Sequence, residues 1–242
     1  MTQPSCRIVL NSVQIARGTA VVIPGLDLLI DGPGWFGLVG ANGSGKTTLL
    51  RAIAGRLMLE EGKVILDGDD LTRDRAERAR RIGYAVDPTL LPPELTPREI
   101  IALADPLPGH WDHGALDVLA DALKITTLLD RRCKALSAGN LQRVAIFTAF
   151  LGLPRVVILD EPFNWLDPVV TLDLKDALSQ MVVTQRMLLI TALHDIATLT
   201  TRCSRAALLS QGQLVREFGV EDLRAAQTDP VAFERTMALD LR

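Results

Sequence analysis

Short apolar runs broken by glycine and proline occupy the chain between residues 8 and 30. Branched aliphatic side chains predominate in the segments 20–23 and 26–30, and Pro24 and Gly25 separate the two. Branched residues favour extended backbone, whereas glycine and proline mark turns. The pattern therefore predicts antiparallel strands over residues 8–30.

Further apolar runs of strand length recur along the chain. The run 35–39 predicts a strand, and the apolar residues after it recur at the three- and four-residue spacing of a helix face, namely Leu49, Leu50, Ile53, Ala54 and Leu57. Runs at 63–66 and 82–86 predict two more strands. The unbroken runs 156–159 and 187–190 are typical of parallel strands buried on both faces. Together these elements predict an α/β fold.

The middle of the chain changes character between residues 88 and 109, where six prolines surround a short helical stretch near 98–104. Helical spacing then continues through two apolar faces, made of Leu116, Leu119, Ala120 and Leu123 and of Val144, Phe147, Phe150 and Leu151. We expect an inserted helical subdomain over about 88–152. A C-terminal tail over about 213–242 is expected to begin as a strand and continue as helix, within one domain spanning 1–242.

The overall charge is small. The 242 residues include 26 lysines and arginines and 29 aspartates and glutamates, for a net charge of -3, which gives no bulk electrostatic reason to expect a nucleic-acid partner. One basic cluster occupies 73–81, where two interleaved acids favour a solvated helix face. No apolar run approaches the roughly 18 residues of a membrane span, and the N-terminus lacks the features of a signal peptide. These features predict a cytoplasmic chain, and three cysteines without C-x-x-C spacing predict free thiols.

The sequence GANGSGKTT at 40–48 fits the phosphate-binding pattern G-x-x-x-x-G-K-[ST] and lies between an expected strand and an expected helix. Its glycines let successive backbone N–H groups curl around phosphate oxygens, and the helix N-terminus adds about half a positive charge. Lys46 is expected to reach the terminal phosphates, and the Thr47 hydroxyl to bind Mg²⁺. The expected nucleotide contacts of the loop are Gly40, Asn42, Gly43, Ser44, Gly45, Lys46, Thr47 and Thr48.

Two carboxylates follow the strand expected at 156–159. Asp160 and Glu161 would stand at the carboxyl edge of the sheet, where α/β folds bind their ligands. We expect Asp160 to hold Mg²⁺, directly or through water, and Glu161 to orient and deprotonate the attacking water. A merely acidic turn after a buried strand is the alternative, and the phosphate loop argues against it.

A second glycine loop, LSAGN at 136–140, leads into the helix expected around Val144. Ser137 and Gly139 suit a helix start, and the N–H groups of such a start form an anion site that could close over a γ-phosphate. A simple helix cap is the alternative. His194 follows the strand expected at 187–190, so we predict a polar contact from it to the γ-phosphate or its water, against the alternative of a structural or exposed histidine.

The segments GANGSGKTT, LSAGNLQR, VVILDEP, NWLDP and TALHD, in this order, resemble the ATP-binding subunit of an ABC transporter. The resemblance runs over most of the chain. It implies a P-loop ATPase core with an antiparallel β subdomain and an inserted helical subdomain. It also implies head-to-tail dimers, homodimeric or heterodimeric, in which the 136–140 loop of one protomer covers the ATP that Lys46 holds in the other.

The chain departs from the family's pattern near the expected site. Asp87 stands where the family usually has glutamine, and an ionised aspartate can bind Mg²⁺ but cannot donate a hydrogen bond. The family's adenine-stacking aromatic would fall near Ala16 or Arg17, so we expect the Arg17 guanidinium to substitute for it. Trp165 replaces a small residue and is expected at the dimer contact.

The resemblance implies an ATPase subunit that uses ATP and Mg²⁺, with Lys46, Glu161 and His194 as its catalytic residues. Such a subunit works on the cytoplasmic face of the membrane with a separate transmembrane permease, which the family docks near the proline-rich stretch 88–108. We favour an exporter, because nothing after Gly212 resembles the regulatory domain of many importer subunits. A soluble ABC ATPase in cytoplasmic assembly and a degenerate ATP-binding structural subunit are the alternatives.

Overall fold

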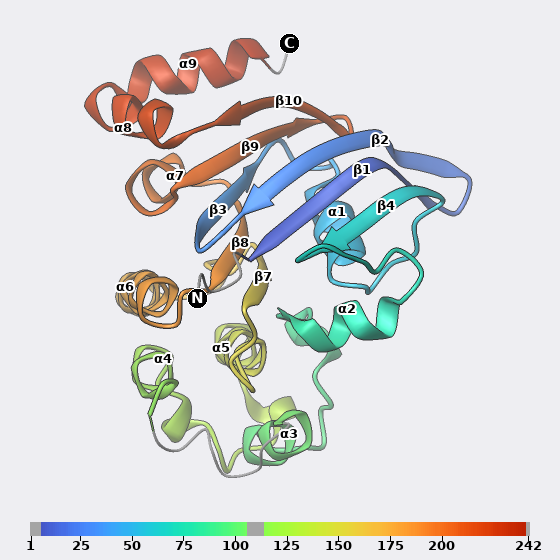
Figure 1. Ribbon diagram of the computed structural model, residues 1–242. Helices are drawn as coiled ribbons and strands as arrows, with labels where there is room; N and C mark the ends of the chain where they lie inside the picture. The colour runs from blue at the N-terminus through green and yellow to red at the C-terminus, as the bar shows by residue number, and fades with distance from the viewer. Residues whose placement is uncertain (1–5, 106–113, 241–242) are drawn as a thin grey trace, which may run out of the picture.

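The computed structural model describes residues 6–105 and 114–240. Two β-sheets form one part of the molecule, and a group of helices between residues 97 and 148 extends to one side of them (Figure 1). This arrangement confirms the expected α/β fold with an antiparallel β region and an inserted helical region. The last part of the proline-rich stretch expected at 88–109, residues 106–109, lies outside the described ranges. The first five residues of the chain lie outside them too.

The first sheet is antiparallel and has the strand order β2-β1-β4-β5 in the described part of the chain. Its strands are β1 (Arg7–Arg17), β2 (Ala20–Asp31), β4 (Glu61–Leu66) and β5 (Asp69–Asp70). Ile8 of β1 lies opposite both Ile30 of β2 and Leu66 of β4, and all three side chains are buried. The alternation of buried and exposed residues along β1 is what one covered sheet face requires. The strands predicted at 8–30 and 63–66 are therefore confirmed.

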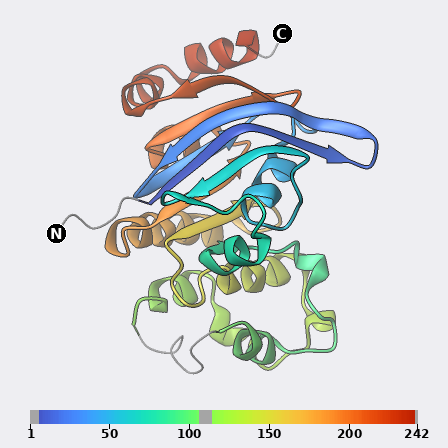
Figure 2. The ribbon, with the colours of Figure 1, turned by 45° about the vertical axis from the view of Figure 1, so that its right-hand side comes forward.

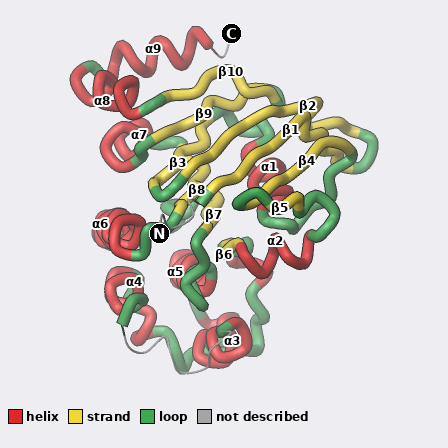
Figure 3. The backbone as a smooth tube through the Cα atoms, in the orientation of Figure 1, coloured by secondary structure: helices red, strands yellow, loops and turns green. Residues whose placement is uncertain are grey.

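The second sheet has the order β10-β9-β3-β8-β7-β6 within the described residues (Figure 3). Its strands are β3 (Gly34–Val39), β6 (Ile82–Tyr84), β7 (Val156–Asp160), β8 (Leu188–Leu193), β9 (Arg205–Ser210) and β10 (Gln213–Phe218). All neighbours are parallel except β10, which runs antiparallel to β9 at the edge. The prediction for 82–86 was too long, because the strand ends at Tyr84.

The helices surround this second sheet and extend from it. They are α1 (Lys46–Ile53), α2 (Arg75–Arg81), α3 (Pro97–Ala104), α4 (Asp117–Ala122), α5 (Ala138–Thr148), α6 (Pro168–Thr184), α7 (Ile196–Arg202), α8 (Val220–Thr228) and α9 (Pro230–Asp240), with short 3₁₀ turns at Pro88–Leu90, Ile125–Thr127 and Cys133–Ala135. The helix predicted through Leu57 ends earlier, because Gly55 adopts a left-handed φ of 72° just past its C-terminus. None of the helices in the described ranges combines the length and apolar character that crossing a bilayer requires.

Buried apolar side chains form three clusters. One fills the space between the two sheets and includes Leu49 and Leu50 of α1. A second covers the other face of the parallel sheet with α4, α5, α6 and α7, and the helical layer is clear in the turned view of Figure 2. A third, smaller cluster joins α3 to α5 through Ile100 and Val144. The sheet is thus buried on both faces, which explains its unbroken apolar runs.

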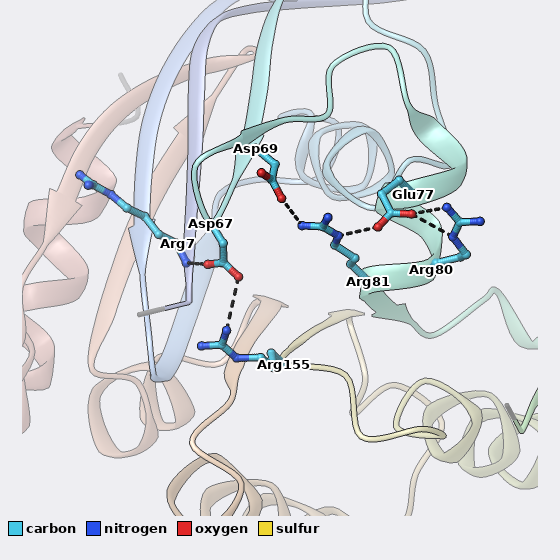
Figure 4. A network of polar contacts seen from close by, with 7 residues as sticks. All are labelled: Arg7, Asp67, Asp69, Glu77, Arg80, Arg81 and Arg155. Atoms are coloured by element: carbon cyan, nitrogen blue, oxygen red, sulfur yellow. Dashed lines mark hydrogen bonds and ion pairs between the residues drawn. The ribbon is translucent and has the colours of Figure 1, made fainter. Parts of the chain in front are cut away.

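Ion pairs and hydrogen bonds tie the antiparallel sheet to α2 and to the segment before β7 (Figure 4). The Asp67 carboxylate accepts from the Arg7 backbone N–H at 2.7 Å and lies 3.6 Å from the Arg155 guanidinium. Arg81 bridges Asp69 and Glu77, at 2.6 Å from each. These exposed contacts are those expected of a solvated basic cluster.

Arg78 contradicts the prediction that the whole 73–81 cluster is a solvated face. Its side chain is fully buried, and none of its three guanidinium nitrogens has a hydrogen-bond partner among the described residues. Burial, followed by the nearby charge of Arg75, lowers the Arg78 pKa. Gly55 packs closely against this part of α2, since a Cβ on Gly55 would stand 3.1 Å from the Arg78 Cβ. The predicted free thiols Cys6, Cys133 and Cys203 are all buried and unpaired in the part of the chain described.

Candidate active site

Four neighbouring strands carry the candidate site. The order β3-β8-β7-β6 is parallel throughout, so the carboxyl ends of these strands meet at one edge of the sheet. The phosphate loop follows β3, His194 follows β8, Glu161 follows β7, and Asp87 comes shortly after β6. Segments separated by more than a hundred residues in sequence are thereby brought side by side.

The phosphate loop depends on its glycines. Gly40, Gly43 and Gly45 have φ values of 152°, 80° and 105°, which side chains rarely adopt. A Cβ on Gly40 would also lie 2.2 Å from the carbonyl oxygen of Leu209 on β9. Gly45 precedes α1 without a capping side chain, so the first turn of the helix presents its backbone to the loop. This geometry is that of an anion-binding helix start.

The loop lines a cleft of about 540 Å³, which we call the loop cleft. Its lining comprises Arg17, Val22, Asn42, Gly43, Ser44, Gly45, Lys46, Thr47, Thr48, Arg51 and Glu161. The loop cleft therefore includes Arg17 at the end of β1, the residue predicted to stack on the adenine base of the nucleotide. Lys46 is buried, and its ammonium donates to the carbonyl oxygens of Gly40 at 2.8 Å and Ala41 at 3.1 Å. Burial lowers the Lys46 pKa, against the opposing charges of Glu161 and Asp160.

The two carboxylates after β7 have different surroundings. Asp160 is hydrogen-bonded to the Thr47 side chain, and burial raises its pKa despite that bond. Its Oδ1 atom is buried and has no hydrogen-bond partner among the described residues. Glu161 is partly exposed and adopts a left-handed φ of 49°, an uncommon conformation for glutamate. The strained turn directs these neighbouring side chains to separate partners.

Glu161 and His194 are in direct side-chain contact at the site. His194 Nε2 lies 2.6 Å from Glu161 Oε1, and Asn164 Nδ2 donates to Glu161 Oε2 at 2.7 Å. Burial alone would raise the Glu161 pKa, but the hydrogen bonds from His194 and Asn164 outweigh it and lower the pKa. Glu161 is therefore held as an oriented carboxylate with one partner on each oxygen. Sequence reasoning found Glu161 and His194 separately but missed both their contact and Asn164.

A second cleft of about 230 Å³, the carboxylate cleft, adjoins the first and shares Thr47, Arg51 and Glu161 with it. Its lining comprises Thr47, Arg51, Tyr84, Ala85, Val86, Asp87, Pro88, Gln142, Asp160, Glu161, Asn164 and Trp165. Asp87 lines this cleft, and its Oδ1 accepts from the Thr89 backbone N–H at 2.9 Å and from the Thr89 hydroxyl at 2.6 Å. Arg51, four residues after Thr47, was not predicted, and the helical spacing of the two was the signal that could have found it.

The second glycine loop forms the start of α5, where Gly139 packs against Trp165 at the carboxylate cleft. Ser137 caps the helix by accepting from the Asn140 N–H at 3.3 Å. Neither Ser137 nor Gly139 lines the loop cleft or the carboxylate cleft in the described part of the chain. The fold therefore does not bring them to the phosphate loop of the same chain.

The oxygen atoms around Thr47 fit a magnesium ion. Mg²⁺ bound with a nucleotide takes one or two protein carboxylates, while phosphates and water complete its shell. The unpartnered Asp160 Oδ1 and the adjacent Thr47 hydroxyl offer such donors. No cluster of three His, Cys, Asp or Glu side chains suited to a metal occurs among the described residues.

Comparison with known proteins agrees with this geometry. Residues 25–164 match the ABC transporter family. The chain is 32% identical over 183 residues to the molybdenum import ATP-binding protein ModC of Rhizobium johnstonii, covering 73% of this chain and 52% of ModC. It is 28% identical over 235 residues to the ferric enterobactin transport ATP-binding protein FepC of Escherichia coli, covering 94% of this chain and 87% of FepC. A solved ATP-binding subunit of an ABC transporter has a TM-score of 0.82 at 24% identity, covering 97% of this chain and 98% of that one.

The chain belongs to the ABC transporter family, and its fold is that of the ATP-binding ATPase subunits of this family. It spans between about half and two thirds of the length of several curated relatives that it matches, ModC among them. ModC is named for import, so export remains a prediction for this chain.

Proposed function

We propose that this chain binds Mg-ATP in the loop cleft, hydrolyses it, and uses the hydrolysis to drive a transmembrane permease. The observation that carries the proposal is the arrangement of Glu161, held by His194 at 2.6 Å and by Asn164 at 2.7 Å. A carboxylate fixed on both oxygens beside a phosphate loop is placed to orient and deprotonate a water. The whole chain acts as one ATPase domain, with residues 88–152 as its helical subdomain.

Each part of the nucleotide meets its own set of residues. The backbone of residues 40–48 and the Lys46 ammonium hold the phosphates, and Arg17 stacks on the base. Thr47 and Asp160 hold the magnesium ion, with Asp87 as a further oxygen donor. The ion supplies charge neutralisation for the phosphoryl group. Glu161 takes the proton of the attacking water, and His194 keeps the Glu161 carboxylate in position.

The active form is a dimer, homodimeric or heterodimeric, in which Ser137 and Gly139 contact the γ-phosphate bound by the partner. Two features of this chain support the arrangement. Neither Ser137 nor Gly139 lines the loop cleft or the carboxylate cleft among the described residues, and Trp165 in the lining of the carboxylate cleft is 64% exposed. An exposed tryptophan beside a site is typical of a surface that a partner covers.

The permease partner docks near the stretch that follows Asp87, where Leu90 is 70% exposed. We keep export as the proposed direction of transport. ModC is named for import, and transport in the import direction would overturn this choice. Reconstitution with the co-purified permease in inverted vesicles distinguishes the two, because an exporter then accumulates substrate inside the vesicles on addition of Mg-ATP.

The test of hydrolysis is the substitution Glu161→Gln, which keeps the size and removes the base. We expect steady-state ATP hydrolysis to fall by about a hundredfold or more. ATP binding should persist in this variant. Its measure is the thermal shift, since Mg-ATP at about a hundred times its dissociation constant stabilises the fold by roughly 2.7 kcal/mol. The control Glu234→Gln alters an exposed glutamate on α9 and should match the wild type. Near-normal turnover in Glu161→Gln would refute the role of Glu161, and no thermal shift in the wild type would refute nucleotide binding.

A further inference from the structure

Lys175 of α6 lies between the two loops that carry Glu161 and His194. Its ammonium donates to Asp195 Oδ2 at 3.0 Å, and Asp195 directly follows His194 in the chain. The same ammonium stands 4.9 Å from the centroid of the Phe163 ring, and Phe163 comes two residues after Glu161. One side chain therefore contacts both loops.

The Asp195 carboxylate is held on both of its oxygens. Its Oδ1 accepts from the Ala197 N–H at 2.9 Å and so caps α7, while its Oδ2 accepts from Lys175 and from the Thr198 hydroxyl. Burial alone would raise the Asp195 pKa, but the hydrogen bonds from Thr198 and Lys175 outweigh it and lower the pKa. Asp195 is therefore an ionised anchor that ties the residue after His194 to α6.

Phe163 fixes the turn that follows Glu161. Its side chain packs against the apolar cluster formed by the parallel sheet with α4, α5, α6 and α7. The Asn164 N–H closes the turn by donating to the Glu161 carbonyl oxygen at 3.3 Å. An ammonium within about 6 Å of an aromatic ring centroid is attracted to the ring face, more strongly where water is excluded. The Lys175 side chain is only 18% exposed, which favours this contact.

The contact between Glu161 and His194 needs such support. Both side chains are partly exposed, at 31% and 41% respectively. A partly exposed pair loses side-chain entropy when it is held in one geometry, and water competes for its polar atoms. A third side chain that fixes the backbone on both sides of the pair reduces this cost.

We propose that Lys175 is a positioning residue, which fixes the Glu161 loop and the His194 loop at the separation that their contact requires. It acts through Phe163 on one side and Asp195 on the other. The inference rests on the proposed function, because it needs Glu161 to act on the attacking water. Lys175 does not line the loop cleft or the carboxylate cleft in the described part of the chain, so its effect reaches the nucleotide only through the two loops.

The test compares Lys175→Met, Lys175→Arg and Asp195→Asn in the full chain. Methionine keeps an apolar stem and removes the ammonium, whereas arginine keeps a cation that can pair with a carboxylate and lie over an aromatic ring. Asparagine caps a helix as well as aspartate does, so Asp195→Asn removes the charge while keeping the α7 cap.

The matched control is Arg202→Met. Arg202 ends α7 and pairs with Asp176 of α6 at 2.6 Å, so it joins the same two helices at the opposite end of α7 from Asp195. The measurements are the kcat and KM of ATP hydrolysis and the thermal shift on Mg-ATP binding.

We expect Lys175→Met and Asp195→Asn each to lower kcat by about tenfold, since slight misplacement of a catalytic group has effects of this size or larger. KM and the Mg-ATP thermal shift should match the wild type, because neither residue lines the loop cleft among the residues described. Lys175→Arg should recover most of the loss. Arg202→Met should have the kcat of the wild type.

A second background separates positioning from a general structural effect. In His194→Ala the contact that Lys175 supports is absent, so adding Lys175→Met should lower the residual kcat by less than about twofold. A general loosening of α6 would instead lower kcat by the same factor in both backgrounds, and that result would overturn the proposal. If Lys175→Met does not fold, Asp195→Asn in the two backgrounds decides by the same criteria.

A wild-type kcat in both Lys175→Met and Asp195→Asn would also overturn the proposal, as would a loss that Lys175→Arg does not recover. Any of these results leaves the proposed function standing as long as Glu161→Gln abolishes turnover. Normal turnover in Glu161→Gln would instead count against the proposed function itself.

Discussion

Asn164 offers a direct measure of how far orientation of Glu161 contributes to hydrolysis. The substitution Asn164→Ala removes the donor that lies 2.7 Å from Glu161 Oε2 and leaves His194 on the other oxygen. A hydrogen bond to a charged group contributes about 1.5 to 3 kcal/mol, with less expected where solvent competes. The Glu161 side chain is 31% exposed, so we expect a loss of about 1 kcal/mol, or roughly fivefold in kcat.

The assay is steady-state ATP hydrolysis with saturating Mg²⁺, paired with the thermal shift on Mg-ATP binding. The effect should appear in kcat with binding retained, because Asn164 contacts the catalytic carboxylate and is not part of the lining of the loop cleft. Asn164→Asp should be more harmful, since a second carboxylate would face Glu161 at hydrogen-bond distance. A wild-type kcat in Asn164→Ala, or an equal loss of binding and turnover, would show that Asn164 does not orient Glu161.

Two other substitutions test the packing around the site. Arg78→Met should raise the free energy of unfolding in urea by about 1 to 4 kcal/mol, because it replaces a buried guanidinium that has no hydrogen-bond partner among the described residues by an apolar chain of similar length. The matched control Arg81→Met breaks exposed ion pairs and should change that free energy by less than about 1 kcal/mol. Marked destabilisation by Arg78→Met would mean that the guanidinium has a stabilising role. Gly40→Ala should abolish the Mg-ATP thermal shift, because its Cβ would stand 2.2 Å from the Leu209 carbonyl oxygen and distort the loop; a normal shift would show that the loop tolerates the change.

Much of the fold was predictable from local pattern. Unbroken apolar runs identified the buried parallel strands, because such strands are covered on both faces. Short branched runs between glycine and proline turns identified the antiparallel ones. Element ends were less predictable. The helix after the phosphate loop stops at Ile53 because of the left-handed Gly55, and Phe150 is buried although α5 ends at Thr148.

The basic cluster at 73–81 shows the limit of composition. Charge alone predicted a solvated face, and Arg80 and Arg81 do pair with Glu77 in exposed contacts. Arg78 is nevertheless buried, because the direction of each side chain depends on what the helix packs against. Burial of a single charge is a property of the assembled fold, and no local pattern in the sequence carries it.

The sequence by itself determined the chemical groups of the candidate site, because the phosphate loop, Asp160, Glu161 and His194 each follow a recognisable strand. Only the tertiary structure decided how these groups meet. The strand order β3-β8-β7-β6 sets His194 beside Glu161 across 33 positions of sequence, and the packing of α5 joins Arg143 to Asp167. The physical reason is that residue type and spacing act over a few neighbouring residues, whereas the order of strands in a sheet depends on the burial of the whole chain.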